Sequence, residues 1–221
     1  MKQNDDIKNL NKKIEKFKKW ALKNHPECDE AHDNGEWEYD PYSYFDEMRD
    51  AAIVVISCND IRCADDELVD NLLYAIARDN ESEIIADELI KYPEWFQLLT
   101  KKSIGSKYIN AGWQFAKRIG ECKECDKQLI FCFIESEDEY TSRMALGALA
   151  DIYPDKAEEY AEMFWNRGKY AEGTYEDEYQ KIMVLTVLQR IGSSKLKEYI
   201  ERAMKFDYKY LTEWAEEFRK S

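Results

Sequence analysis

Cysteine and histidine are the residue types in this chain whose spacing could build a metal or redox site. Cys122 and Cys125 form a C-x-x-C pair, and Cys132 follows seven residues later. A structural zinc site needs four Cys or His ligands at close spacing, and no second pair or nearby histidine completes this one. On one helix these three positions would share roughly one face, as buried apolar thiols do. We therefore interpret them as core cysteines, with a metal or redox role as the alternative.

A second group of potential ligands lies near the start of the chain. His25, Cys28 and His32 are spaced H-x2-C-x3-H and include both histidines of the sequence. The segment is acidic and contains a proline, so we expect an exposed loop in which three such ligands would bind zinc only weakly. We assign no metal and no cofactor to the chain, and a site at these three residues stays open.

Motifs for nucleophilic or phosphoryl chemistry do not occur in the sequence. It has no G-x-S-x-G elbow, no Gly-rich phosphate loop and no H-E-x-x-H motif. Acidic runs such as 65–67 and 176–178 fall at predicted helix starts, where carboxylates interact favourably with the positive end of the helix dipole. The sequence therefore predicts a protein that is not an enzyme.

Two segments interleave aromatic and acidic residues in predicted loops. Trp and Tyr dominate interface hot spots, and carboxylates around them would select Lys or Arg on a partner. The candidate partner-binding residues are Glu36, Trp37, Glu38, Tyr39, Asp40 and Tyr42 in the first segment, and Tyr170, Glu172 and Tyr175 in the second. Packing of the first segment onto its own helices is the alternative interpretation.

The charge balance narrows the class of partner. The chain has 46 acidic and 32 basic side chains, a formal net charge of −14. Nucleic acids and anionic membrane surfaces both attract Lys and Arg, so this balance disfavours them and favours a basic protein. The sequence shows no signal-peptide pattern at its start and no apolar run of roughly 18 residues. Because we interpret its cysteines as free thiols, the sequence predicts a cytoplasmic protein.

Helical periodicity runs through the whole chain. Only eight glycines and four prolines occur in 221 residues, which favours long helices joined by short loops. A first helix should cover residues 5–24 and a second should cover 41–57. The β-branched run 51–56 could alternatively be a buried strand, but no other segment offers a strand to pair with it. The apolar face of the first helix would consist of Ile7, Leu10, Ile14, Phe17 and Leu22.

From residue 65 a repeat appears, with three apolar residues at i, i+1 and i+4 in each of four segments. A few turn-like residues and a second amphipathic stretch follow each trio, which predicts two antiparallel helices per unit. The units recur roughly every 40 residues. The trios are Leu72, Leu73 and Ile76; Phe115, Ala116 and Ile119; Ala148, Leu149 and Ile152; Val187, Leu188 and Ile191.

Local signals mark several helix ends. Asn80 with Glu83 and Ser136 with Glu139 fit N-terminal capping patterns. Gly120 and Gly192 stand where a helix end favours a left-handed residue, and Pro154 suits a first helical turn. We also expect a short helix over 94–102 and a terminal capping helix over 208–220. The inward-facing residues of that last helix would be Tyr210, Leu211, Trp214 and Phe218.

Period and apolar pattern together resemble HEAT-like repeat proteins over about residues 65–206. Arg118 and Arg190 recur before the closing isoleucine, although the matching residue between them is Asp151, and the family's regular proline is missing. The resemblance implies an all-α fold, a right-handed α-α superhelix of stacked antiparallel helical hairpins. A TPR-type or irregular helical array is the alternative. The HEAT-like resemblance implies a recognition surface and supplies no catalytic residues.

We expect one domain over 1–221, with N-terminal helices and an acidic aromatic loop in 1–57, hairpin repeats in 65–206 and a capping helix in 207–221. The leading functional hypothesis is a protein-binding module, most concretely an acidic inhibitor or immunity protein that neutralises a basic toxin or enzyme domain. An adaptor in a larger assembly is the alternative. A HEAT-like nucleic-acid enzyme is the enzymatic rival, because residues 89–120 combine six basic residues with Trp95, Phe96, Tyr108 and Trp113.

Overall fold

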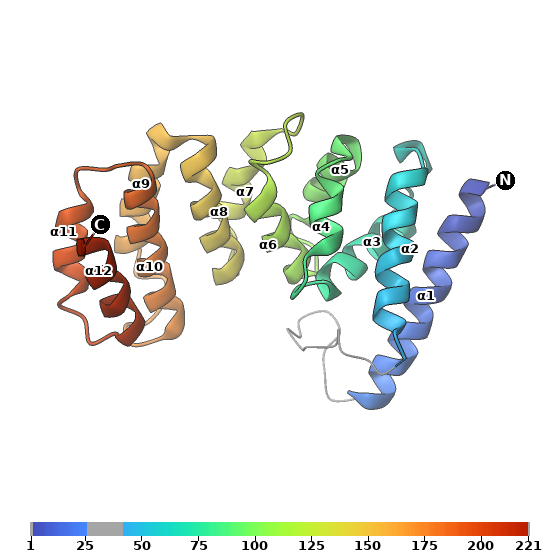
Figure 1. Ribbon diagram of the computed structural model, residues 1–221, viewed down its shortest axis with the longest axis horizontal. Coiled ribbons are helices and arrows are strands. Elements are labelled where there is room, and N and C mark those ends of the chain that lie inside the picture. Colours follow the sequence, from blue (N-terminus) through green and yellow to red (C-terminus); the bar gives the residue numbers. More distant parts are fainter. Residues whose placement is uncertain (1, 26–41, 221) are drawn as a thin grey trace. The chain divides into compact units, whose positions relative to one another are not determined.

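The structure is a computed structural model that describes residues 2–25 and 42–220, with side chains from residue 5 onward (Figure 1). All regular elements in this described part are helices, and it contains no strand. The all-α prediction is confirmed. The run 51–56 lies inside a helix, so the strand alternative is wrong.

The chain divides into two compact units, residues 1–129 and 130–221. The prediction of one domain over 1–221 stays a prediction. The elements of the first unit are α1 (Lys2–Asn24), α2 (Tyr44–Cys58), a 3-10 turn (Ile61–Cys63), α3 (Asp66–Arg78), α4 (Ile84–Leu89), α5 (Pro93–Ser103), α6 (Ile109–Arg118) and a second 3-10 turn (Lys127–Leu129). Those of the second are α7 (Ile130–Ile134), α8 (Glu139–Ile152), α9 (Pro154–Asn166), α10 (Tyr175–Arg190), α11 (Leu196–Ala203) and α12 (Lys209–Lys220).

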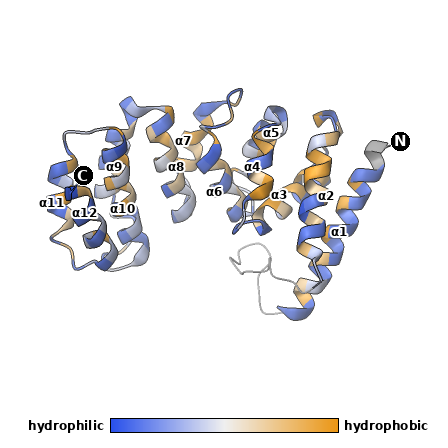
Figure 2. Cartoon of the chain, viewed as in Figure 1, coloured by the Kyte–Doolittle hydropathy of each residue, from blue (hydrophilic) through white to orange (hydrophobic). Residues whose placement is uncertain are grey.

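In the first unit α1 packs along α2, and α3 packs against α1, α2 and α6. Figure 2 shows α1 as largely hydrophilic, as its lysine-rich outer face predicts, and α2 with a long apolar run. Phe17 and Tyr74 are fully buried, with ring centroids 6.4 Å apart. Leu22, predicted on the apolar face of α1, is exposed, whereas Ala21 is buried in its place. The helix buries the apolar side chains that face α2 and α3, and Leu22 lies outside that face.

In the second unit α8 packs against α7, α9 and α10, and α10 packs against α9, α11 and α12. A Cβ at Gly147 would lie 3.1 Å from the Met183 sulfur, so glycine permits the close approach of α8 and α10. Arg190 donates to Asp151 over 3.0 Å. Asp151, the residue that departs from the repeated arginine, is thus the partner of the arginine in the next unit.

Helices pack against their chain neighbours in both units, which is compatible with a helical repeat. Every trio residue is buried except Ile152 and Ile191, which are half-buried at the ends of their helices. The trios therefore form the core-facing stripe that their spacing predicts.

Some predicted helix ends are confirmed and others are wrong. Pro154 begins α9, and Gly192 adopts a left-handed φ of 65° after α10. Gly120 does not have a positive φ. Asn80 does not cap α4, because Glu83 is the residue before that helix and Asp79 accepts from the Ile85 amide over 2.6 Å. The cap of α8 is Asp138, which accepts from the Thr141 amide, and not Ser136.

The prediction of free, mostly buried thiols is wrong for most of the cysteines that the structure describes. Cys122 and Cys125 are buried but form a disulfide, with Cα atoms 5.6 Å apart. They lie in the turn between α6 and the second 3-10 turn rather than on a helix, and a turn brings C-x-x-C residues within bonding range. Cys58 and Cys132 are exposed. Within the described residues, no helix has both the length and the apolar character needed to cross a membrane.

Candidate partner-binding surface

Four tyrosines of the second unit form a partly exposed row, which we call the tyrosine ladder: Tyr140 of α8, Tyr175 and Tyr179 of α10, and Tyr210 of α12. The rings of Tyr175 and Tyr179 stack with centroids 6.3 Å apart and an interplanar angle of 24°. Tyr179 and Tyr210 stack over 6.2 Å at 12°. Tyr175 is 68% exposed, and each of the other three is 38–39% exposed. Aromatic surface of this kind is characteristic of protein interfaces.

A guanidinium group of the chain itself lies in the ladder. The Cζ atom of Arg143 is 4.7 Å from the ring centroid of Tyr140 and 5.2 Å from that of Tyr179. Lys209 places its ammonium 5.2 Å from the Tyr210 centroid. Both arrangements are cation–π contacts, in which the negative face of the ring attracts the cation. The ladder therefore binds cations within its own chain.

Helical spacing and helix packing together build the ladder. Tyr175 and Tyr179 are four residues apart, so α10 presents them on one face. On α12 the core-facing stripe is Leu211, Ala215 and Phe218, which leaves Tyr210 exposed at the edge. The expectation that Tyr210 and Trp214 face inward is therefore wrong. Trp214 is 42% exposed and lies one turn beyond Tyr210.

A buried hydrogen-bond network holds the helices that carry the ladder. The Tyr208 hydroxyl donates to Asp177 Oδ2 over 2.6 Å and accepts from the Gly173 amide over 2.7 Å. Asp177 also pairs with Lys181, and Glu178 accepts from the Leu211 amide over 2.9 Å. Burial, followed by the hydrogen bond to Asp177, raises the pKa of Tyr208 to about 12. The network connects α12 to the first turn of α10 and to the turn before α10. It therefore fixes the positions of the tyrosine rings on both helices.

Partly buried charged groups also surround Arg143. Glu139 pairs with Arg143 over 2.8 Å, yet burial raises the pKa of Glu139 despite this partner. Arg167 donates to Gln180 Oε1 over 2.9 Å and stacks 3.6 Å above the Phe164 ring. Burial lowers the pKa of Arg167. Perturbed groups of this kind gather at functional sites and also in structural ion-pair networks.

Acidic residues border the ladder. Glu172 precedes α10, Glu176 follows Tyr175, and Glu213 precedes Trp214, and all three are exposed. The surface thus combines aromatic faces with carboxylates, which suits the alkyl stem and cationic head of Arg or Lys.

The predicted partner-binding residues have different positions. Tyr175 lies in the ladder, and Glu172 lies beside it. Tyr170 is half-buried, and burial raises the pKa of its hydroxyl. Tyr42 is exposed in the first unit and stacks on Tyr44 over 5.2 Å. Glu36, Trp37, Glu38, Tyr39 and Asp40 lie outside the described residues.

Sequence reasoning missed Tyr140, Arg143, Tyr179 and Tyr210. The spacing of Tyr175 and Tyr179 could have indicated their pairing, but residues on three separate helices show no common pattern along the chain. Only the packing of α10 against both α8 and α12 brings the tyrosines together.

The other candidate ligands form no site in the described part of the chain. The His25 ring lies edge-on to Trp20, with centroids 5.5 Å apart. Cys28 and His32 lie outside the described residues, so a three-ligand site there stays a prediction. Across residues 2–25 and 42–220 no group of three potential metal ligands occurs.

In the basic, aromatic stretch 89–120 the lysines are exposed, but the four aromatic residues predicted to accompany them are not. Trp95, Phe96, Tyr108 and Trp113 are buried. Five of the six cations of the stretch pair with carboxylates of the same unit: Lys91 with Glu88, Lys102 with Asp66, Lys107 with Asp70, and both Lys117 and Arg118 with Glu83. Most of its positive charge is therefore neutralised internally.

Comparison of the chain with protein-family models, curated proteins and solved structures gives no match. The HEAT-like resemblance therefore stays a prediction from the repeat pattern, and the neighbour packing of the helices is compatible with a helical repeat.

Proposed function

We propose that this protein acts by binding rather than by catalysis, and that the tyrosine ladder recognises a basic protein partner. The observation that carries the proposal is the position of Arg143 between two rings of the ladder. A partner's Arg or Lys can make the same contact with the remaining ring surface, of which Tyr175 has the most. The exposed carboxylates beside the rings add charge-assisted hydrogen bonds.

The most concrete form of this function is an acidic inhibitor, or immunity protein, that neutralises a basic toxin or enzyme domain. A net charge of −14 supports it, because complementary charge speeds association with such a partner. A right-handed HEAT-like superhelix and a cytoplasmic location belong to the same proposal. An adaptor in a larger assembly is the alternative form and would use the same surface. Internal pairing of the 89–120 cations gives a nucleic-acid enzyme little support.

The direct test measures the affinity for a fluorescent arginine-rich peptide by fluorescence anisotropy. Tyr179→Ala removes the central ring, and we expect it to weaken binding about tenfold, since one desolvated cation–π contact contributes on the order of 1–2 kcal/mol. Tyr42→Ala removes an exposed tyrosine of the other predicted segment and serves as the matched control. If Tyr42→Ala weakened binding and Tyr179→Ala did not, the ladder would be the wrong surface.

Two further probes separate the classes of partner. A glutamate-rich peptide of equal length and a single-stranded oligonucleotide should both bind far more weakly than the arginine-rich peptide. Preferential binding of the oligonucleotide would favour the nucleic-acid alternative. For the inhibitor form, the product of the neighbouring gene is the first partner to examine, because inhibitors are usually encoded beside their targets.

A further inference from the structure

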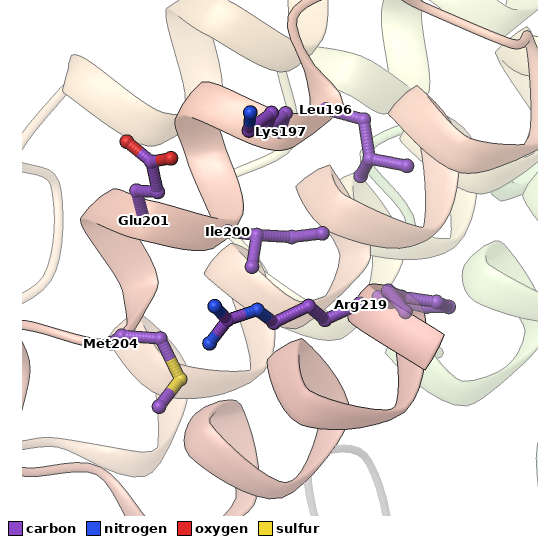
Figure 3. Close-up of a pocket in the computed structure, with 7 residues that line it drawn as sticks. Leu196, Lys197, Ile200, Glu201, Met204 and Arg219 are labelled. Carbon is purple, nitrogen blue, oxygen red and sulfur yellow. The ribbon is translucent and has the colours of Figure 1, made fainter. Parts of the chain in front are cut away.

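A groove between α11 and α12 is separate from the tyrosine ladder (Figure 3). Its volume is about 470 Å³. The apolar lining consists of Leu196, Ile200, Met204 and Phe218, and the charged lining consists of Lys197, Glu201 and Arg219. Figure 3 shows Leu196 and Ile200 on α11 and Met204 just after it, with Arg219 extending toward them from α12.

The apolar residues of α11 follow a spacing that suits helix packing. Leu196, Ile200 and Met204 are four residues apart and form one stripe, with Lys197 and Glu201 beside it on the same side. Met204 is 39% exposed, although Ile200 is almost covered. Leu196 is half-buried, so the two ends of the stripe, more than its centre, are open to contact with a second helix.

The stripe and its flanking charges are complementary to themselves. Two copies of α11 can lie antiparallel, related by a two-fold axis at the level of residue 199. A residue a given number of positions before 199 in one copy then lies level with the residue the same number of positions after 199 in the other copy. Lys197 and Glu201 are both two residues from that centre, so Lys197 lies level with the partner subunit's Glu201, and the symmetry makes this contact twice. The two stripes interleave at intervals of two residues, about 3 Å along the helix axis, so their side chains alternate.

We propose that this groove is a two-fold interface between two copies of the chain, built from α11 of each copy. Like charges stay further apart than opposite ones in this register, since the two Glu201 carboxylates are separated by four residues of rise, about 6 Å. A dimer of this kind presents two ladders and does not depend on the nature of the ladder's ligand.

Sedimentation equilibrium of the full chain tests the interface. The wild type should reach the dimer mass as its concentration rises. Glu201→Lys replaces two opposite-charge contacts with two like-charge ones, and we expect about tenfold weaker dimerisation. Lys197→Glu combined with Glu201→Lys exchanges the charges and should restore the wild-type constant.

Glu216→Lys makes the same charge change on the exposed surface of α12, outside the groove lining, and should leave dimerisation unchanged. Far-UV circular dichroism verifies that each variant is folded. A wild type that stays monomeric at all concentrations would overturn the proposal. So would a dimer that Glu201→Lys leaves intact, or one that the double exchange fails to restore.

Discussion

At the scale of single residues, Tyr208 connects the ladder to the rest of the second unit. Its side chain is buried beside Asp177, and its hydroxyl serves both a carboxylate and a backbone amide. Removing one partner of a buried hydrogen bond leaves the other unsatisfied, which costs more than the bond contributes on average. Tyr210 is only two positions away, but its ring is partly exposed and stacks on Tyr179.

Tyr208→Phe should therefore lower the free energy of unfolding by about 1–3 kcal/mol, because Asp177 and the Gly173 amide both lose a partner. Urea denaturation measures the change. Tyr210→Phe is the matched control and should cost less than about 0.5 kcal/mol, since it removes a hydroxyl from an exposed ring. Equal effects of the two substitutions would show that the network does not stabilise the unit.

The same hydroxyl gives a pH dependence at the alkaline end. Its pKa rises from the ordinary 10.0 to about 12 in the folded protein, so the folded state holds this proton more tightly than the unfolded state does. The stabilisation is fully present below pH 10 and is lost as the pH rises through 12. The difference in unfolding free energy between the wild type and Tyr208→Phe should shrink over this window. A constant difference from pH 8 to pH 12 would contradict the shift.

At the scale of elements, helix ends and helix faces decide how the second unit is arranged. Gly192 ends α10 with a left-handed φ of 65°, and the Ser193 amide then donates to the Leu188 carbonyl over 2.9 Å. This pattern is the Schellman ending that satisfies the last carbonyls of a helix. A Cβ at Gly192 would meet nothing within 4 Å, so backbone conformation alone determines the effect of a substitution.

Gly192→Ala should lower the free energy of unfolding by about 1 kcal/mol, because alanine tolerates a left-handed φ poorly. Gly192→Asn should cost clearly less, since asparagine adopts this conformation more readily. Urea denaturation of both variants gives the comparison. If alanine proved as favourable as asparagine, the left-handed ending would be the wrong description of this helix end.

At the scale of the whole molecule, net charge and aromatic surface should control different steps of binding. The formal charge of −14 acts over long distances and attracts a cationic partner, whereas the rings act only in contact. Mutations and salts that change long-range fields mainly alter association rates, while buried contacts mainly alter dissociation rates.

Stopped-flow measurements with the arginine-rich peptide should show this division. Raising the NaCl concentration from about 20 mM to about 150 mM should slow association roughly tenfold and change dissociation little. Tyr179→Ala should accelerate dissociation with little effect on association. Glu176→Lys beside the ladder should reduce association more than Glu216→Lys, although both change the net charge equally. A salt-independent association rate would contradict electrostatic steering.

The sequence by itself was sufficient for the helical class, the apolar trios and several helix ends, because these depend on spacing within one element. Residues 51–56, Pro154 and Gly192 behave as their local patterns predict. Tyr175 was also found as a candidate, since an exposed aromatic residue beside acids is visible along the chain.

Tertiary packing determined the remainder. Which side of α1 and α12 is buried depends on the neighbouring helices, so Leu22 and Trp214 are exposed although their hydropathy predicted burial. The Cys122–Cys125 disulfide depends on the path of a turn, and the ladder depends on three helices that meet in space. Periodicity indicates which residues share a face of one helix, whereas only the contacts between helices show which faces meet.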